Sequence, residues 1–243
     1  MSVSRNRTDP LIERMQTQVQ QWQEVGDTRS TFLYCYQLMT SNMLSAIEAG
    51  EFSNQAWIDE LLRRFAGYYF NALDAYEQKS GDVPAVWSIT HDATHNPKTR
   101  TLQNLLLGVN AHINYDLIFT LAELLQPEWN RLDEQQRQCR YMDHCRVNDI
   151  IGQTIDSVQD QVVEPLEPGL ELVDILLLNA DEWMISRLIS HWRENVWQKA
   201  IQLLECTEPG DRKHLQQEIE FSTLQRANAI LLKQGLGGLR ELL

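Results

Sequence analysis

Hydrophobic residues along this chain recur mostly at intervals of three and four, the spacing that places them on one face of an α-helix. Alternation with a period of two, which is typical of a half-buried strand, is almost absent. Capping residues, prolines and glycines interrupt the helical pattern, for example at Asp9-Pro10, Gly26 and Gly50. The pattern therefore predicts an all-α protein, a single-domain bundle of seven to eight helices over residues 1–243.

These interruptions set the expected helix boundaries. Residues 85–101 lack clear periodicity and are expected to form a loop, which is the best candidate for a functional loop. The C-terminal helices are expected to pack on the rest of the domain, since no long linker separates them. The expected helices cover residues 10–25, 30–49, 53–78, 103–125, 133–163, 171–204 (interrupted near 179–181) and 211–234.

The fourth expected helix contains an unusual polar pattern. The segment LLLGVNAHINYDLIFTLAELL is apolar almost throughout, yet it contains Asn110, His112, Asn114 and Asp116 at alternate positions. At 100° per residue these residues form two i,i+4 pairs on roughly opposite sides of the helix. A helix that is apolar on both flanks is normally central in a bundle. Both pairs should therefore be buried or line a cavity, and each then needs partners.

Each pair has two interpretations. His112 and Asp116 could hold a metal ion, because an imidazole and a carboxylate one turn apart can bind one ion in a bundle core. They could instead form a buried hydrogen bond that ties this helix to its neighbours. Asn110 and Asn114 could bind a substrate, or their amides could bridge to other helices.

Other polar residues could complete a site. His91 and His95 have the spacing H-x-x-x-H, which suits a metal on a helical turn, but they could also be surface histidines of the loop. His144 lies on the apolar ridge of the helix expected over 133–163 and should point inward, either as a ligand or as a core histidine bonded to a carbonyl. Asn148 lies one turn further on, and Asp149 lies at the edge of the same face.

Composition narrows the possible functions. Lys and Arg total 21 against 34 Asp and Glu, a formal charge of −13, which disfavours binding to nucleic acids or to anionic membranes. No apolar run reaches the ~18 residues of a membrane span, and no secretory signal is visible. The four cysteines form no C-x-x-C pair, which suggests free thiols in a reducing cytoplasm. The motifs of serine hydrolases, P-loop proteins, Rossmann folds and H-E-x-x-H enzymes are absent.

The segment LLLGVNAHINYDL resembles the signature of a mostly bacterial family of helical proteins, a domain of unknown function. The segments FLYCYQLMTSNMLSAIEAGEF, LLRRFAGYYFNAL, VPAVW and DHCRVNDIIGQTID extend the resemblance over roughly residues 28–165. The resemblance implies that the N-A-H-I-N-x-D-L residues are signature positions, with Val147, Asn148 and Asp149 as a second cluster. The His-x-x-x-Asp pair is also similar to part of the metal site of zinc-dependent phospholipase C, a partial analogy at the level of the fold.

Three functional hypotheses follow. The first is an enzyme, a hydrolase or an oxygenase, with catalytic residues His112 and Asp116 and a divalent metal, zinc or iron. It would act on a small neutral or lipid-like substrate oriented by Asn110, Asn114 and Asn148. The second is a metal-free module that binds a hydrophobic ligand or a partner protein. The third is metal-free acid–base chemistry by His112 and Asp116. Under any of these hypotheses, an apolar helical surface could support a homodimer. Metal ligands would come from His112, Asp116, His144, His91, His95 and Asp149.

Overall fold

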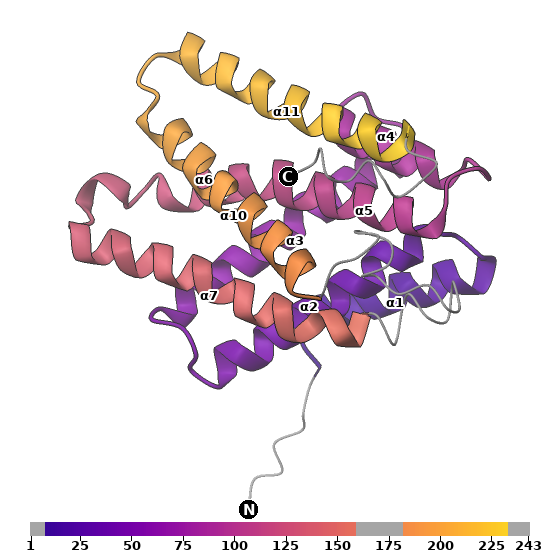
Figure 1. The fold of residues 1–243 in the computed structure, drawn as a ribbon, viewed down its shortest axis with the longest axis horizontal. Coiled ribbons are helices and arrows are strands. Elements are labelled where there is room, and N and C mark those ends of the chain that lie inside the picture. The colour runs from indigo at the N-terminus through magenta and orange to yellow at the C-terminus, as the bar shows by residue number, and fades with distance from the viewer. Residues whose placement is uncertain (1–7, 159–181, 233–243) are drawn as a thin grey trace, which may run out of the picture.

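The structure, a computed structural model, describes residues 8–158 and 182–232, and side chains within residues 8–154 and 189–232. All regular elements in these ranges are helical, which confirms the predicted class (Figure 1). Because α5, η1 and α6 form one continuous helix, the described part of the chain contains eight α-helices, which agrees with the predicted seven to eight. The elements are α1 (Pro10–Val25), α2 (Arg29–Glu48), α3 (Gln55–Glu77), α4 (Ala85–Thr94), α5 (Thr101–Ala111), η1 (His112–Asp116), α6 (Leu117–Leu125), η2 (Trp129–Arg131), α7 (Glu134–Val158), α10 (Glu182–Glu205) and α11 (Pro209–Leu232).

Local capping explains why the sequence pattern located most boundaries within two residues. The Asp9 carboxylate accepts a hydrogen bond from the Leu11 amide at 2.8 Å, with Pro10 in the first helical position of α1. Gly26 ends α1 with a φ of 71°, which a residue with a side chain rarely adopts. Asn54 caps α3 by accepting from the Trp57 amide at 2.9 Å. The parts of the expected helices over 159–163 and 171–181, and the expected interruption, lie outside the described residues.

One element was predicted wrongly. Residues 85–101 were expected to form a loop, but Ala85–Thr94 form the helix α4. Ten residues give fewer than three turns, too few for a clear period, and polar side chains share the buried face. The Thr90 hydroxyl can be buried at little cost because it donates a hydrogen bond to the Val86 carbonyl of its own helix at 2.7 Å. Within this range only residues 95–100 are not helical.

The helix expected to be central occupies that place. Figure 1 shows α5 and α6 running through the middle of the molecule, with α11 on one side and α2 and α7 on the other. The η1 segment at its midpoint packs against α3, α10 and α11. Residues Thr101–Leu125 are long and apolar enough to cross a membrane, but 72% of their most apolar window is buried inside the protein. They are therefore described best as the core helix of the bundle.

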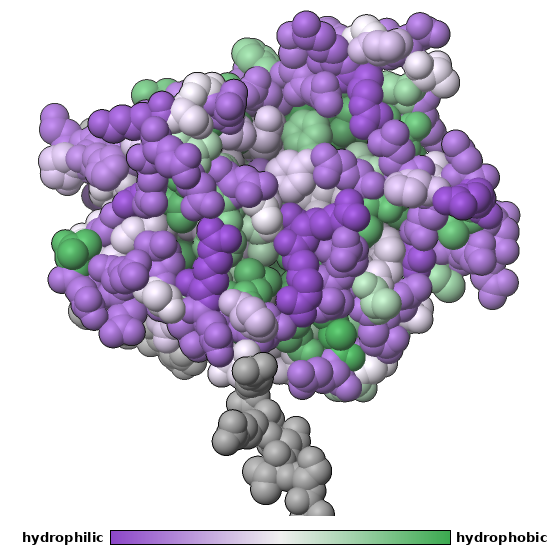
Figure 2. Space-filling view, turned by 180° about the vertical axis from the view of Figure 1, so that it is seen from behind, coloured by the Kyte–Doolittle hydropathy of each residue, from purple (hydrophilic) through white to green (hydrophobic). Residues whose placement is uncertain are grey.

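Two large hydrophobic clusters lie toward the two ends of the central helix. One gathers α1, α2, α3, α4 and α5 and contains Met15, Leu33 and Trp87. The other gathers α2, α3, α6, α7, α10 and α11 and contains Leu121 and Trp197. A smaller third cluster joins α4, α5, α10 and α11. The outer surface is mostly hydrophilic on the face that Figure 2 shows, with hydrophobic side chains visible between the polar ones. The η1 segment lies where the two clusters meet, and the candidate site is built around it.

Candidate functional site

His112 and Asp116 lie in one turn of π-helix within the central helix. In this turn the Leu117 amide bonds to the carbonyl of His112, five residues back, rather than to that of residue 113. Single π-turns inside α-helices are rare and occur frequently at functional sites. The predicted i,i+4 pairing of His112 and Asp116 persists, because residues four apart still share a side of this wider turn.

The His112 imidazole and the Asp116 carboxylate are joined directly. Nδ1 of His112 lies 2.9 Å from Oδ2 of Asp116. The Trp87 indole, from α4, donates its Nε1–H to both carboxylate oxygens, at 3.0 Å to Oδ2 and 3.1 Å to Oδ1. All three side chains are fully or almost fully buried, with exposed fractions of 3% for His112, 1% for Asp116 and 0% for Trp87. A carboxylate that accepts from Trp87 holds the imidazole with its Nδ1 proton toward Asp116.

Aromatic rings fix the orientation of the imidazole. The Phe65 ring of α3 stacks on it with a centroid distance of 3.5 Å and an interplanar angle of 7°. The Tyr36 ring of α2 meets it edge-on at 4.4 Å. The second ring nitrogen, Nε2, is buried and has no hydrogen-bond partner. A buried nitrogen without a partner is costly to maintain, and such an atom calls for an explanation such as a ligand or a catalytic role.

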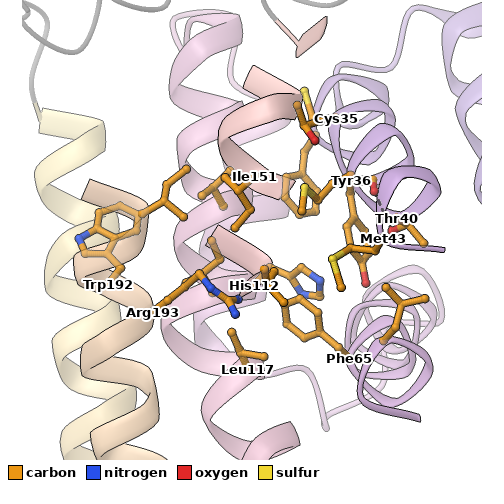
Figure 3. A pocket seen from close by; sticks show the side chains of 18 of the residues that line it. Cys35, Tyr36, Thr40, Met43, Phe65, His112, Leu117, Ile151, Trp192 and Arg193 are labelled. Carbon is orange, nitrogen blue, oxygen red and sulfur yellow. Dashed lines mark hydrogen bonds between the residues drawn. The ribbon is translucent and has the colours of Figure 1, made fainter. Parts of the chain in front are cut away.

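His112 lines a cavity of about 220 Å³ in the interior of the bundle (Figure 3). Side chains from α2, α3, α7, α10 and the central helix form its walls, and most of them are apolar. The hydroxyl of Tyr36, which also lines the cavity, is a second buried polar atom without a partner. Figure 3 shows His112 between α2 and α3 on one side and Arg193 of α10 on the other. The wall side chains include Phe32, Cys35, Met39, Met43, Leu61, Phe65, Leu106, Val109, Ile113, Leu117, Val147, Ile151 and Trp192.

Burial governs the protonation of these groups. It lowers the pKa of His112 well below its ordinary value, which favours a neutral imidazole. It raises the pKa of the Asp116 carboxyl, and the hydrogen bond from Trp87 opposes that rise. Burial also raises the pKa of the Tyr36 hydroxyl, so that this group remains a hydrogen-bond donor. Burial raises the pKa of the Cys35 thiol to about 12, so it is not an activated nucleophile.

Asp116 has a second environment on its other side. It contributes to the lining of a more polar hollow of about 690 Å³, together with Tyr68, Tyr115 and Glu123. The Tyr68 hydroxyl donates to the Glu123 carboxylate at 2.6 Å. The His112–Asp116 pair thus lies between an apolar cavity and a more polar hollow.

Asn110 and Asn114 form the other i,i+4 pair and face α11 instead. Nδ2 of Asn114 donates to Oδ1 of Asn110 at 3.1 Å, and Nδ2 of Asn110 donates to the Thr223 carbonyl at 3.0 Å. The Thr223 hydroxyl donates to the Asn114 carbonyl at 3.1 Å. Both asparagines are buried, and neither lines the cavity at His112. In this structure they join the central helix to α11.

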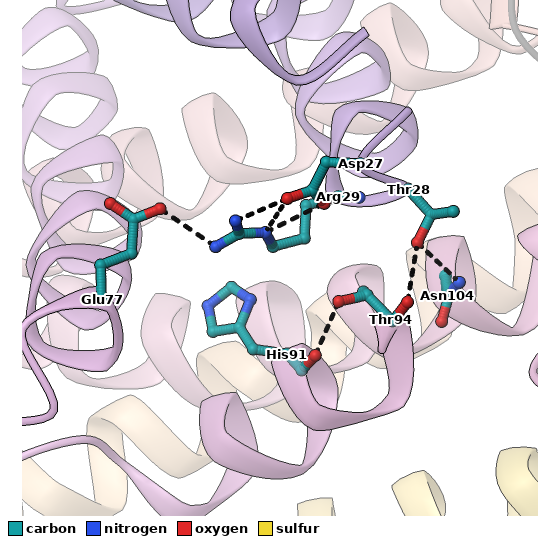
Figure 4. A network of polar contacts seen from close by, with 7 residues as sticks. All are labelled: Asp27, Thr28, Arg29, Glu77, His91, Thr94 and Asn104. Carbon is teal, nitrogen blue, oxygen red and sulfur yellow. Dashed lines mark hydrogen bonds and ion pairs between the residues drawn. The ribbon is translucent and has the colours of Figure 1, made fainter. Parts of the chain in front are cut away.

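His91 and His95 lie away from the His112–Asp116 pair. His91 is buried on α4, where its ring stacks on Trp87 at 5.3 Å, and its Nε2 has no partner. Figure 4 shows it beside the Arg29 side chain, which pairs with Asp27 and Glu77. His95, the C-cap of α4, is exposed. The two histidines are therefore not a pair of surface loop residues, and they do not meet around one point with His112.

His144 points inward as predicted and is 1% exposed. Its Nε2 bonds to the backbone carbonyl of Arg193 at 3.0 Å, so it has the carbonyl-bonded role considered above. Asn148 accepts from Nε of Arg193 at 2.7 Å. Asp149 has a largely exposed side chain and forms an ion pair with Arg146. These residues connect α7 to α10 and the surface rather than to His112.

Among the residues that the structure describes, no three His, Cys, Asp or Glu side chains gather in a way that could hold a metal ion. Of the six candidate ligands only His112 and Asp116 meet. The sequence pattern did not single out two important residues near His112 and Asp116. Trp87 was placed in the expected loop, and Arg193, in the helix expected over 171–204, was not among the candidate residues. A lone buried arginine has no local signature, because its partners are distant in sequence.

Neither the comparison with curated proteins nor that with solved structures finds a match for this chain. One family model does match, and it spans residues 8–233, which covers all the helices described above. The resemblance to a helical family of unknown function, inferred from the N-A-H-I-N-x-D-L segment and its flanks, agrees with this match in fold class. The chain therefore belongs to DUF5995, a family of unknown function.

Proposed function

We propose that the protein is an enzyme that uses the His112–Asp116 pair for acid–base catalysis, without a metal, on a small lipid-like substrate. The observation that carries the proposal is the buried Nε2 of His112, which has no partner and borders the apolar cavity. An imidazole oriented by a carboxylate through Nδ1, with Nε2 free, is the arrangement of a general base. Asp116 and Trp87 would act as positioning residues.

Hydrolysis of a carboxylic ester is the reaction that these groups suit best. The oxygen of a water molecule would bond to the carbonyl carbon while its proton passes to Nε2 of His112. The same proton would then pass to the leaving alkoxide as the carbon–oxygen bond breaks, giving an acid and an alcohol. The Tyr36 hydroxyl, buried without a partner, is the donor available to the carbonyl oxygen.

The first test is hydrolysis of p-nitrophenyl esters with acyl chains from acetyl to dodecanoyl. We expect the native protein to prefer chains that fill the cavity. His112→Gln should lower kcat/KM by about 10²- to 10⁴-fold, the usual contribution of a general base. His95→Gln changes an exposed histidine and is the matched control. Equal rates for native protein and His112→Gln would contradict the proposal.

The pH profile of the same reaction gives a second readout. The base must be neutral, and burial lowers the pKa of His112. We therefore expect kcat/KM to stay constant as the pH falls through 6.5, the ordinary value for histidine, and to decline only in more acidic solution. A decline centred at or above pH 6.5 would contradict this assignment.

The apolar lining of the cavity also favours a second function, binding of a hydrophobic ligand without turnover. In that case His112 would donate or accept one hydrogen bond to the ligand. The two functions differ in one outcome: a binding protein would retain a suitable ester intact, whereas the enzyme would release its alcohol.

A further inference from the structure

Arg193 is a buried cation at the edge of the cavity. It is 4% exposed, it lies on α10, and it lines the cavity together with His112. Figure 3 shows its side chain extending from α10 toward the middle of the pocket, on the side opposite α2. The acid–base mechanism proposed above does not use it. Its position therefore needs an explanation of its own.

The hydrogen bonds of Arg193 all go to neutral groups. Nε donates to the Asn148 side chain at 2.7 Å, and Nη2 donates to the His144 carbonyl at 2.8 Å. Nη2 also lies 3.2 Å from Nδ1 of His144, whose pKa is lowered far below the ordinary value by burial and by this arginine. The remaining nitrogen, Nη1, makes none of these bonds. No carboxylate among the described residues forms an ion pair with Arg193.

A buried charge without a counter-ion is strongly disfavoured. Removing a single ion from water costs several kcal/mol even after the protein relaxes, and neutral hydrogen bonds offset only part of that cost. Arginine does not avoid this cost by losing its proton near neutral pH, since its guanidinium remains charged. The free Nη1 of this charged guanidinium is matched best by an anionic acceptor such as a carboxylate, to which it donates a charge-assisted hydrogen bond.

The rest of the cavity limits what can be attached to that carboxylate. Apart from Arg193, His112, Tyr36 and two threonines, the described residues that line the cavity are aliphatic, aromatic or sulfur-containing. A cavity of about 150 Å³ accommodates the six carbons of benzene. On the same scale, a cavity of about 220 Å³ would hold about nine non-hydrogen atoms. The space therefore suits one short aliphatic chain.

We propose that the cavity binds a medium-chain monocarboxylate of about seven carbons, with its carboxylate on Arg193 and its chain between α2, α3 and α7. This inference deepens the proposed function, because such an acid is the product of ester hydrolysis. The link between the acid and the reaction rests on the proposed function. Binding of the acid itself does not require that the reaction occurs.

Isothermal titration calorimetry with heptanoate, 1-heptanol and heptyltrimethylammonium tests the inference on the native protein. All three have a seven-carbon chain and differ in the head group, and each is used below its micellar concentration. We expect heptanoate to bind at least ten-fold more tightly than heptanol, and the cationic ligand not to bind. Equal or tighter binding of heptanol would overturn the proposal, since the chain alone would then account for affinity.

Substitutions locate the head group. In Arg193→Met the preference for heptanoate over heptanol should disappear, whereas Arg193→Lys, which keeps the charge, should retain part of it. Arg140→Met, which removes a half-buried arginine paired with Glu128 outside the cavity, is the matched control and should retain the full preference. Persistence of the preference in a folded Arg193→Met would overturn the assignment. If that variant fails to fold, the head-group series on the native protein decides the proposal alone.

The outcome of this experiment is independent of catalysis. His112→Gln should still bind heptanoate while losing ester hydrolysis. Tight heptanoate binding without hydrolysis would reject the proposed enzyme and keep the carboxylate site. Hydrolysis of esters without a preference for heptanoate over heptanol would reject the carboxylate site and keep the enzyme.

Discussion

His112 differs from the other buried histidines in the surroundings of its second nitrogen. His144 uses both ring nitrogens on Arg193, through a carbonyl at 3.0 Å and a guanidinium at 3.2 Å. His91 has a free Nε2 but is not among the residues that line the cavity. Only at His112, among the described histidines, do an oriented Nδ1, a free Nε2 and an apolar cavity occur together. This combination, rather than burial, distinguishes a candidate catalytic histidine here.

The indole of Trp87 should matter to the reaction through Asp116. Trp87→Phe removes the Nε1–H that both carboxylate oxygens accept, so the pKa of the Asp116 carboxyl should rise further. A protonated Asp116 orients the imidazole less well, and we expect kcat/KM for ester hydrolysis to fall by about ten-fold. The lost hydrogen bond to a buried charge should also lower the free energy of unfolding by about 1–3 kcal/mol.

Steady-state kinetics and urea unfolding measure both effects. Trp129→Phe, which changes a partly buried tryptophan of η2 far from Asp116 in the fold, is the control. A Trp87→Phe variant with native kcat/KM would show that Asp116 does not need this donor.

At the scale of elements, Gly108 sets the distance between the central helix and α2. A Cβ built on Gly108 would lie 2.4 Å from Cγ and Cδ2 of the Phe32 ring and 3.0 Å from its Cβ. The Phe32 ring in turn borders both His112 and Trp87. Gly108 therefore permits a close approach that also shapes the site.

We expect Gly108→Ala to lower the free energy of unfolding by about 1–3 kcal/mol, because Phe32 must move within a packed core. Gly67→Ala is the matched control: Gly67 also lies inside a helix, and nothing lies within 4 Å of its added Cβ. The free energy of unfolding of that variant should rise by up to about 1 kcal/mol because alanine has a higher helix propensity than glycine. Urea unfolding distinguishes the two, and a neutral or stabilising Gly108→Ala would contradict the close packing.

The contact between η1 and α11 depends on Thr223. Its hydroxyl bonds to the Ile219 carbonyl at 2.8 Å within α11 and to the Asn114 carbonyl at 3.1 Å across the interface. Thr223→Val keeps the shape and removes both bonds, leaving the Asn114 carbonyl without this donor. We expect a loss of about 1–3 kcal/mol in the free energy of unfolding.

Thr17→Val provides the comparison for that variant. The Thr17 hydroxyl makes only the bond to the carbonyl one turn back, at 2.8 Å, and it is exposed. Its loss should change the free energy of unfolding by less than about 0.5 kcal/mol. Equal effects of the two substitutions in thermal or urea unfolding would mean that the bond across the interface adds nothing.

At the scale of the whole molecule, the buried histidines make the fold sensitive to acid. His91, His112 and His144 lie on α4, η1 and α7, and burial lowers the pKa of each. An unfolded chain binds a proton at each histidine below about pH 6.5, whereas the folded protein does not until more acidic pH. The unfolded state therefore gains protons first, and stability falls as the pH drops.

Burial lowers the pKa of His91 to about 4, so its contribution to stability is lost over the pH range, or window, from 6.5 down to about 4. We expect this residue to account for up to about 3 kcal/mol of the stability lost across the window, from about 1.36 kcal/mol per pKa unit. The free energy of unfolding of His91→Gln should therefore depend less on pH over this range than that of the native protein. His214→Gln, which changes an exposed histidine, is the matched control.

Several features of this protein follow from local sequence alone. Helical periodicity and capping residues such as Asp9 and Asn54 identified most of the helices, because these signals act within a few residues of one another. The same periodicity placed His144 inward and paired His112 with Asp116 and Asn110 with Asn114, as the hydrogen bonds confirm. It did not identify α4, whose ten residues are too few to establish a period.

Only the tertiary structure decided what each inward residue meets. Trp87 reaches Asp116 across 29 positions, Arg193 reaches His144 across 49, and Asn110 reaches Thr223 across 113. Periodicity specifies which face of a helix is buried but not which helix covers it, so neither the scattered metal-ligand candidates nor the Arg193 site could be resolved from sequence. The cavity has the same origin, since it is the space that five packed helical segments leave between them.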